Sequence, residues 1–285
     1  MRRFIIFSAL LAVYLVTSPM AHTTAPYSLD SPVGGCEGIV AGADLGSILR
    51  QALGVAAPDK KVNGGLGNHV WATVVDRFGI VCAVTHTGKL GDQWLGSRMI
   101  SAQKATTAVL FSLPAAAGGT IDAMSTANLW TSQQPGGGVL GLQLANAAQP
   151  QAEAGGNGMA IGVQLPFDAG DDPLVGHAVA GTNVFGGGLA LYDADGNLIG
   201  GIGISGDTAC ADHNVAWRVR HELALDRLRS GNVIGLGNVL ELDPDRPDNI
   251  IYDITPVSGE SASGFGHPRC GFGEEAAAMD LPAVR

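Results

Sequence analysis

Three short motifs in the sequence combine residue types that carry catalysis or metal binding in other proteins. Asp193-x-Asp195-x-Asn197 begins like a calcium loop, in which acidic side chains supply the oxygen ligands. The sixth position of this loop is Leu198 instead of glycine, and the twelfth is Ile204 instead of glutamate. We therefore interpret the motif as a hairpin turn and not as a calcium site.

The other two motifs point to hydrolysis. His221-Glu222 lacks the second histidine of a zinc-protease motif, which excludes that class. Residues 203–207, Gly-Ile-Ser-Gly-Asp, resemble a nucleophile elbow, but Asp207 stands where the second glycine belongs. Ser205 with His213 and an aspartate remains an alternative as a catalytic triad. Serine beside glycine is ordinary turn chemistry, so no catalytic residue is identified.

The composition excludes further classes of function. The 285 residues include 16 basic and 26 acidic side chains, and the net charge of −10 argues against nucleic acid, whose phosphates require a basic surface. Aromatic residues make up only 6%, so stacking platforms for bases are scarce. Hydrophobic residues make up 46%, which is enough for a sizeable core. The 42 glycines are about twice the usual share of roughly 7%.

Residues 1–21 predict a secretory signal peptide. Arg2 and Arg3 precede an apolar run over residues 4–16, and small residues follow. This run is too short for the roughly 20 residues that a membrane-spanning helix needs. We expect cleavage after Ala21 and a secreted or periplasmic protein without a membrane span, with a retained anchor as the alternative.

Export makes the four cysteines candidates for disulfides, because oxidising compartments preserve them. Cys36, Cys82, Cys210 and Cys270 lack the C-x-x-C spacing of zinc and redox sites. Four cysteines allow three pairings, and the sequence does not choose between them. We favour Cys36–Cys82 and Cys210–Cys270, which join neighbours along the chain. Four buried thiols are the alternative.

Hydrophobic periodicity places the middle of the chain on regular elements. Asp44 and Asp212 are expected to cap the first and last helices. Turns at residues 76–79 and 193–197 are expected to join two pairs of strands as hairpins. The expected helices cover residues 45–53, 97–112 and 213–228, and the expected strands cover residues 70–75, 80–85, 189–192 and 198–204.

We interpret the chain as a single domain with extensions. Residues 22–42 form an irregular lead-in, and the domain covers residues 43–228. Within it, a glycine-rich stretch at about residues 115–181 is typical of inserted loops and short strands. Residues 229–285 are rich in proline and are expected to extend over the surface.

Three segments together resemble the GlcG/HbpS family of haem-binding proteins, also called DUF336. The resemblance covers about residues 43–112 and 183–228, less than half of the chain. The long middle stretch and the tail exceed the family's minimal module and indicate an elaborated, exported branch. The three segments are residues 74–79 (Val-Val-Asp-Arg-Phe-Gly), residues 101–112 (beginning Ser-Ala-Gln-Lys) and residues 185–206 (Phe-Gly-Gly-Gly through Ile-Ser-Gly).

The resemblance implies an α/β (α+β) fold with a mainly antiparallel five-stranded sheet and helices packed on one face. It also implies homo-oligomers and the binding of haem or a related ligand. Other family members are linked to small organic acids or to corrinoid metabolism, so the fold alone does not decide the ligand.

Haem iron requires an axial side chain, and histidine is one of the usual choices. His86 follows a strand and His213 opens a helix beside a glycine-rich turn, so both suit the lip of a pocket. Surface or capping histidines are the alternative. His22 and His267 fall in segments that we expect to be flexible, and we set them aside.

A second set of residues suits an anionic ligand. Asp76, Lys104 and the triplet Gly186, Gly187 and Gly188 match family positions, and Ser205 follows in the same glycine-rich hairpin. Lys104 would supply positive charge, and glycine N–H groups would approach a carboxylate or a haem propionate. The alternative is that Lys104 is a surface lysine and Asp76 a turn former.

We therefore expect an exported protein that binds haem in order to sequester or sense it. A binding protein is favoured over an enzyme, and the sequence leaves open whether the ligand undergoes chemistry. The alternative is a binding module or enzyme for an organic or aromatic acid that works without iron through Lys104 and Asp76. A structural oligomer without a ligand is the third hypothesis.

Overall fold

The computed structural model describes residues 35–39, 44–57, 60–113, 123–142, 172, 174–179, 181–228, 243 and 245–285. The signal peptide predicted for residues 1–21 and most of the predicted insertion lie outside these ranges. Within the ranges, no helix has the length and apolar character that crossing a bilayer requires.

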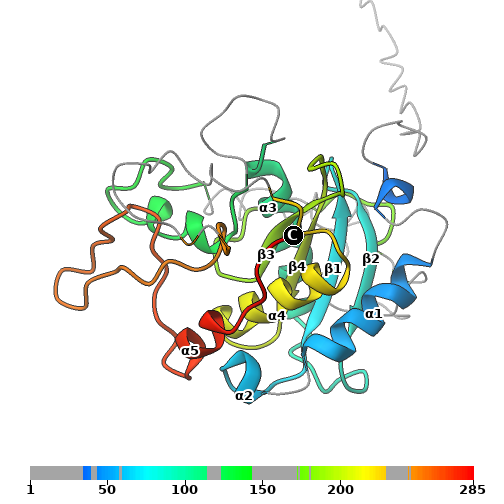
Figure 1. Cartoon of the computed structure of the whole chain (residues 1–285), viewed down its shortest axis with the longest axis horizontal. Helices are drawn as coiled ribbons and strands as arrows, with labels where there is room; N and C mark the ends of the chain where they lie inside the picture. Colours follow the sequence, from blue (N-terminus) through cyan, green and yellow to red (C-terminus); the bar gives the residue numbers. More distant parts are fainter. Residues whose placement is uncertain are drawn as a thin grey trace, which may run out of the picture.

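Four antiparallel strands form the centre of the fold (Figure 1). They are β1 (Trp71–Asp76), β2 (Val81–His86), β3 (Gly188–Tyr192) and β4 (Leu198–Ser205), in the order β2-β1-β4-β3. Trp71 lies opposite His86 on one side and Ser205 on the other. Asp76 lies opposite Gly200. His86 and Ser205 therefore share one end of the sheet, and Asp76 lies at the other end.

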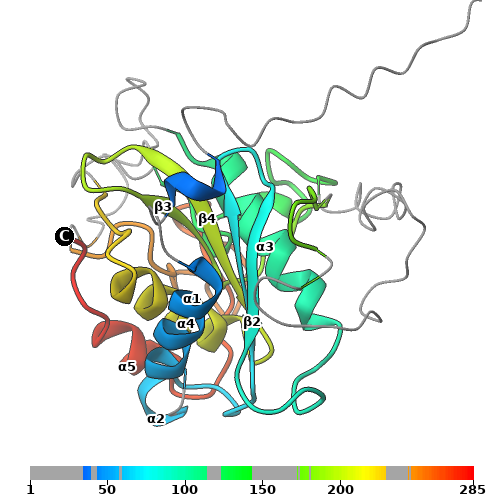
Figure 2. The same cartoon turned by 90° about the vertical axis from the view of Figure 1, so that its right-hand side faces the viewer.

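Helices cover both faces of this sheet (Figure 2). The strands send apolar side chains alternately to two cores: Leu189 and Leu191 to one, Ala190 and Tyr192 to the other. The prediction of helices on one face is therefore wrong, and the described residues contain four strands instead of five. α3 (Ser97–Phe111) packs on one face, and α1 (Leu45–Ala56) and α4 (Ala209–Glu222) pack on the other, where α2 (Lys60–Asn63) and α5 (Glu274–Met279) adjoin α4.

Glycines in β4 allow α3 to lie directly against the sheet. A Cβ atom at Gly201 would overlap the carbonyl oxygen of Ala105, and one at Gly203 would overlap that of Ser101. Any side chain at these two positions would push the helix away from the strand. Part of the glycine excess therefore serves helix–sheet packing.

The four strands lie within one residue of their predicted ranges, whereas three helix ends differ by more than that. Asp44 caps α1 as predicted, but the helix continues past Gly54. Thr208, and not Asp212, caps α4, because its side chain accepts a backbone N–H of the first turn at 3.2 Å. The helix therefore begins earlier than predicted, which places Asp212 inside its first turn. It also ends at residue 222 and not near 228.

The C-terminal segment packs into the domain instead of lying only on its surface. Leu281 belongs to the core between the sheet, α1 and α4. The indole N–H of Trp217 donates to the carbonyl oxygen of Pro282 at 2.9 Å. His267 and Glu274, from the same segment, are also buried. Residues close to the C-terminus thus reach the interior of the protein.

Candidate functional site

A cavity of about 410 Å³ opens where α3, the end of β4, the start of α4 and the C-terminal segment meet. We call it the ligand pocket. Trp94, Ile100 and Phe185 form an apolar wall, and its volume lies within the usual range of small-molecule sites. The polar lining includes Lys104, Ser205, Asp207, Asp212 and His267. The pocket therefore combines an apolar surface with a few converging polar groups.

A buried ion pair forms the polar floor of the ligand pocket. The Nζ of Lys104 donates to Oδ2 of Asp212 at 2.9 Å and to the carbonyl oxygen of Ile204 at 3.0 Å. Oδ1 of Asp212 accepts the backbone N–H of Asp207 at 2.9 Å. Both charged side chains are almost fully buried, so the alternative of a surface lysine is wrong. An ammonium group has three N–H donors, and described protein partners account for two of them here.

The charge of this floor depends on pH. Burial raises the pKa of Asp212 to about 6, although the neighbouring Lys104 and the Asp207 N–H favour the charged carboxylate. At neutral pH the two charges of the pair compensate each other. Below about pH 6 the carboxyl group takes up a proton and leaves the ammonium group as an uncompensated cation. The floor therefore attracts anions more strongly as the pH falls.

The predicted glycine triplet borders the ion pair. The N–H of Gly186 donates to Nε2 of His267 at 3.3 Å, and that of Gly188 donates to the hydroxyl of Thr126 at 2.9 Å. A Cβ atom at Gly187 would lie 3.0 Å from the Nζ of Lys104. The triplet thus makes room for the lysine. This corrects the expectation that the N–H groups of Gly186 and Gly188 face a ligand, because both have protein partners.

Asp76 lies away from the ligand pocket, at the opposite end of the sheet. Its Oδ1 accepts the backbone N–H groups of Phe78 at 2.8 Å and Ile80 at 2.9 Å. These bonds fix the turn between β1 and β2, and burial raises the pKa of the carboxyl group. The expected constellation of Asp76 with Lys104 is therefore wrong, because Lys104 bonds to the other end of β4.

Neither of the two candidate axial histidines is among the described residues that line the ligand pocket. His213 is 0% exposed and packs beside Trp217, and burial lowers its pKa well below the usual value. The prediction that His213 lies at the lip of a pocket is wrong, because α4 begins earlier than predicted and its residue 213 faces the interior. His86 is partly exposed, packs against Trp71 and lines another cavity.

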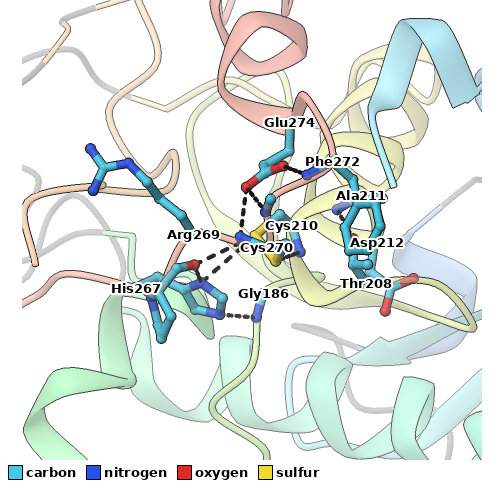
Figure 3. The surroundings of a disulfide bond; sticks show 12 residues. Gly186, Thr208, Cys210, Ala211, Asp212, His267, Arg269, Cys270, Phe272 and Glu274 are labelled. Atoms are coloured by element: carbon cyan, nitrogen blue, oxygen red, sulfur yellow. Dashed lines mark hydrogen bonds between the residues drawn. A yellow bond between two sulfur atoms is a disulfide. The ribbon is translucent and has the colours of Figure 1, made fainter. Parts of the chain in front are cut away.

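The histidine in the wall of the ligand pocket is His267, which sequence reasoning set aside (Figure 3). Its Nδ1 lies 2.8 Å from the carbonyl oxygen of Pro268, and its Nε2 accepts the Gly186 N–H, which assigns the proton to Nδ1. Burial lowers the pKa of His267 to about 4. Cys270, three residues later, could have indicated that His267 is held in place, since a disulfide at Cys270 fixes this segment.

The four cysteines form two disulfides, and these join the two pairs that we predicted as neighbours along the chain. Cys36 is bonded to Cys82 and Cys210 to Cys270, with Cα–Cα distances of 5.3 and 6.1 Å. The second bond holds the C-terminal segment against the start of α4 (Figure 3). The Glu274 carboxylate accepts three backbone N–H groups of the same segment at 2.6–2.9 Å. Together these contacts fix the wall that carries the pocket histidine.

Among the described residues, one set of three side chains has metal-ligand atoms close together. These atoms belong to Cys210, Cys270 and Glu274 and lie within 4.8 Å of one another. The two sulfur atoms are bonded to each other, so they cannot act as thiolate ligands in this form. The described residues therefore offer a ligand pocket and not a preformed metal centre.

An antiparallel sheet between two helical layers, with an apolar-walled pocket over a buried ion pair, defines an α+β domain with a candidate small-molecule site. The sequence matches the model of the family described as "Haem degrading protein HbpS-like" over residues 50–220, which is more than half of the chain. The chain belongs to the HbpS-like family. No curated protein sequence matches it.

Several solved structures are similar to this chain. The Klebsiella pneumoniae protein ORFY, a DUF336 protein, is 21% identical, with 62% of this chain and 86% of that chain covered and a TM-score of 0.39. PduOC, solved as a complex with haem, is 23% identical, with coverages of 66% and 94% and a TM-score of 0.38. HbpS is 20% identical, with coverages of 61% and 86% and a TM-score of 0.30.

Proposed function

We propose that this protein binds haem in the ligand pocket and serves to sequester or sense it. The proposal rests on one observation: the buried ammonium group of Lys104 lies at the floor of a cavity with an apolar wall. A haem has apolar faces and two anionic propionates, so it requires both features. The family description and the haem complex of PduOC support the same ligand class.

The residues of the pocket fit the parts of a haem. Trp94 and Phe185 are exposed at the pocket and present aromatic surface to a flat macrocycle. Lys104 would direct its third N–H to a propionate oxygen. The Ser205 hydroxyl, from the same lining, would be a further hydrogen-bond partner. The bound group would supply the iron and its redox chemistry.

The pocket wall also contains a side chain that can bind iron, His267. Metal-bound histidines typically donate their second ring N–H to a carbonyl group, which is the arrangement of His267 with Pro268. On haem binding, the Nε2 atom of His267 would give up the 3.3 Å hydrogen bond from Gly186 and would bind the iron instead. We therefore propose His267 as the axial ligand in place of His86 and His213.

A hemin titration followed by absorption spectroscopy tests this function. We expect a saturable change of the Soret band at one hemin per chain. Lys104→Met should weaken binding by roughly tenfold through loss of a charge-assisted contact. His267→Ala should change the position of the band. Lys89→Gln, which alters an exposed lysine outside the pocket, is the matched control. No saturable change in the unaltered protein would refute haem binding.

Because Lys104→Met leaves a buried carboxyl group without its partner, its fold must be checked by circular dichroism. The double variant Lys104→Met/Asp212→Asn removes both charges and keeps the test usable if the single variant unfolds. Weak hemin binding by a folded double variant would support the anchoring role of the lysine. Unchanged binding by this variant would contradict it.

A second candidate function is the binding of an aromatic carboxylic acid without iron. The observation that favours it is the placement of two aromatic side chains, Trp94 and Phe185, in one cavity with Lys104. Thermal stabilisation by a panel of organic and aromatic acids, with hemin inactive, would establish this alternative. Hemin binding without any response to the acids would exclude it.

We also propose that the protein is exported and forms homo-oligomers. Two disulfides are consistent with an oxidising compartment, and the predicted signal peptide would direct the chain there. N-terminal sequencing of the secreted or periplasmic product is expected to begin at His22. Sedimentation analysis is expected to give a mass above the 29.0 kDa of one full chain.

A further inference from the structure

A second cavity, of about 360 Å³, lies at the same end of the sheet as the ligand pocket but is lined by α1. We call it the α1 cavity. Its walls come from the second half of α1, from residues 67–69 before β1 and from residues 86–88 at the end of β2. None of these residues is among those that line the ligand pocket. The two cavities are therefore separate sites.

The α1 cavity is lined by one cationic side chain and two imidazoles. Its described lining includes the guanidinium of Arg50 and the imidazoles of His69 and His86, and it includes no carboxylate. The chain as a whole carries a net charge of −10. A concave surface whose described lining holds a guanidinium and two imidazoles but no carboxylate is therefore unusual in this protein, and it favours a negatively charged ligand.

Local contacts hold these three side chains in place. Nε of Arg50 donates to the hydroxyl of Thr85 on β2 at 3.3 Å, which fixes the guanidinium beside the strand. Nδ1 of His69 lies 3.2 Å from the hydroxyl of Thr87, and that hydroxyl accepts the N–H of Val70 at 3.0 Å. The Thr87 hydroxyl thus connects the imidazole to the backbone just before β1.

The second imidazole is fixed from the same loop. Nδ1 of His86 lies 3.1 Å from the side-chain amide nitrogen of Gln93 and 3.3 Å from the carbonyl oxygen of Thr87. The two N–H groups of this amide also have acceptors in the carbonyl oxygens of Thr87 and Lys89. The described contacts of both rings are thus made by Nδ1, and Nε2 lies on the other side of each ring. Two imidazoles and a guanidinium therefore surround one cavity.

Two described carboxylates interact with residues around this cavity: Asp44, at the start of α1, interacts electrostatically with Arg50, and Asp207 bonds to the loop of residues 66–68. The two oxygens of Asp207 accept the backbone N–H groups of Leu66, Gly67 and Asn68 at 2.7–2.8 Å and that of Thr208 at 2.6 Å. This carboxylate belongs to the lining of the ligand pocket and not to that of the α1 cavity. It fixes the loop that separates the two cavities.

We propose that the α1 cavity binds a small oxyanion, a carboxylate or a phosphate, through Arg50, His69 and His86. This site goes beyond the proposed haem site, shares no lining residue with it and does not depend on it. The cavity is much larger than a single metal ion requires, and a guanidinium would repel a cation. An anion therefore suits the lining better than a metal.

Isothermal titration with inorganic phosphate and, separately, with succinate tests the proposal and distinguishes the two sources of oxyanion. We expect saturable one-to-one binding of at least one of them at low ionic strength. Arg50→Gln, His69→Ala and His86→Ala should each weaken it by roughly tenfold. Arg77→Gln is the matched control, because Arg77 lies at the opposite end of the sheet and bonds to the carbonyl oxygen of Val109.

Ring signals of the two histidines in NMR spectra of the unaltered protein provide a measurement that needs no variant. They should shift on addition of the bound anion. Absence of saturable binding for both anions would overturn the proposal, as would an equal loss in Arg77→Gln. Zn²⁺ binding that the histidine variants abolish and Arg50→Gln leaves intact would identify a metal site instead. Hemin titration of the same variants should be unchanged, so the two proposals fail independently.

Discussion

The two disulfides lie at opposite ends of the sheet, and their surroundings differ. Cys82 lies near the start of β2, at the end where Asp76 closes the hairpin. Cys210 lies in the first turn of α4, at the end where Lys104 and His267 meet. At the hairpin end, one oxygen of the buried Asp76 carboxylate accepts hydrogen bonds from its own turn, within four residues, and no partner is described for the other oxygen. The pocket end satisfies its carboxylate from a lysine 108 residues away.

This comparison shows how a functional site differs from a structural turn in the same fold. A carboxylate bonded to its own turn stabilises only that turn. A carboxylate bonded across two helices makes pocket geometry, charge and stability depend on one another. Variants at the two ends of the sheet should therefore separate the effects on stability from the effects on ligand binding.

The largest effect is expected for Lys104→Met. It leaves Asp212 buried without its cation, which typically costs about 3–5 kcal/mol. Urea unfolding at pH 7 measures this loss. Because the pKa of Asp212 is about 6, the loss should be smaller at pH 5, where the carboxyl group is protonated. A loss that does not depend on pH would contradict the buried ion pair.

The two disulfides are expected to differ in ligand binding and not in stability. The two disulfides close loops of 46 and 60 residues. In the chain-entropy model, each disulfide therefore stabilises the folded protein by about 4 kcal/mol. Cys210→Ser/Cys270→Ser should therefore lower both the unfolding free energy and the hemin affinity. Cys36→Ser/Cys82→Ser, the matched control, should lower only the unfolding free energy. Equal loss of hemin affinity in both would show that the pocket wall has no special role.

His267 should make the pocket end sensitive to acid. Its pKa is about 4 in the folded protein and near 6.5 in the unfolded chain, so the unfolded chain binds the additional proton between these values. Its contribution to stability is fully present above pH 6.5 and is lost as the pH falls toward 4. The expected loss is on the order of 3 kcal/mol. His267→Gln should flatten this part of the stability curve, whereas an unchanged curve would contradict the burial of a neutral imidazole.

The smallest effect is expected at the hairpin end. Asp76→Ala removes two hydrogen bonds to the turn, at a cost of about 1 kcal/mol. Hemin binding should remain unchanged, because Asp76 lies at the other end of the sheet from the ligand pocket. A loss of hemin affinity in this variant would remove the distinction between the two ends.

Local features of the fold were predictable from the sequence, and the long-range contacts of the site were not. Strand positions follow from alternation and turn residues, which act within a few positions, so each strand lies within one residue of its prediction. The partner of Lys104 depends on how α3 and α4 meet across the sheet. The burial of His267 depends on a disulfide to α4. No pattern over a short window contains this information.

The helices on both faces were missed for a related reason. A strand without polar alternation, such as β3 (Gly-Leu-Ala-Leu-Tyr) with five buried positions, indicates two covered faces. The family resemblance implied one covered face and took precedence over that pattern. In this case the pattern of the residues was the better guide.

The contact between α3 and the glycines of β4 has a consequence for redesign of the protein. Because backbone rests on backbone at Gly201 and Gly203, the depth at which Lys104 sits is set without any side chain between helix and strand. In a library of variants, these two positions should accept no other amino acid. Trp94, Ile100 and Phe185 can vary around them. The ligand preference of the protein can therefore be altered from the walls while the floor keeps its dimensions.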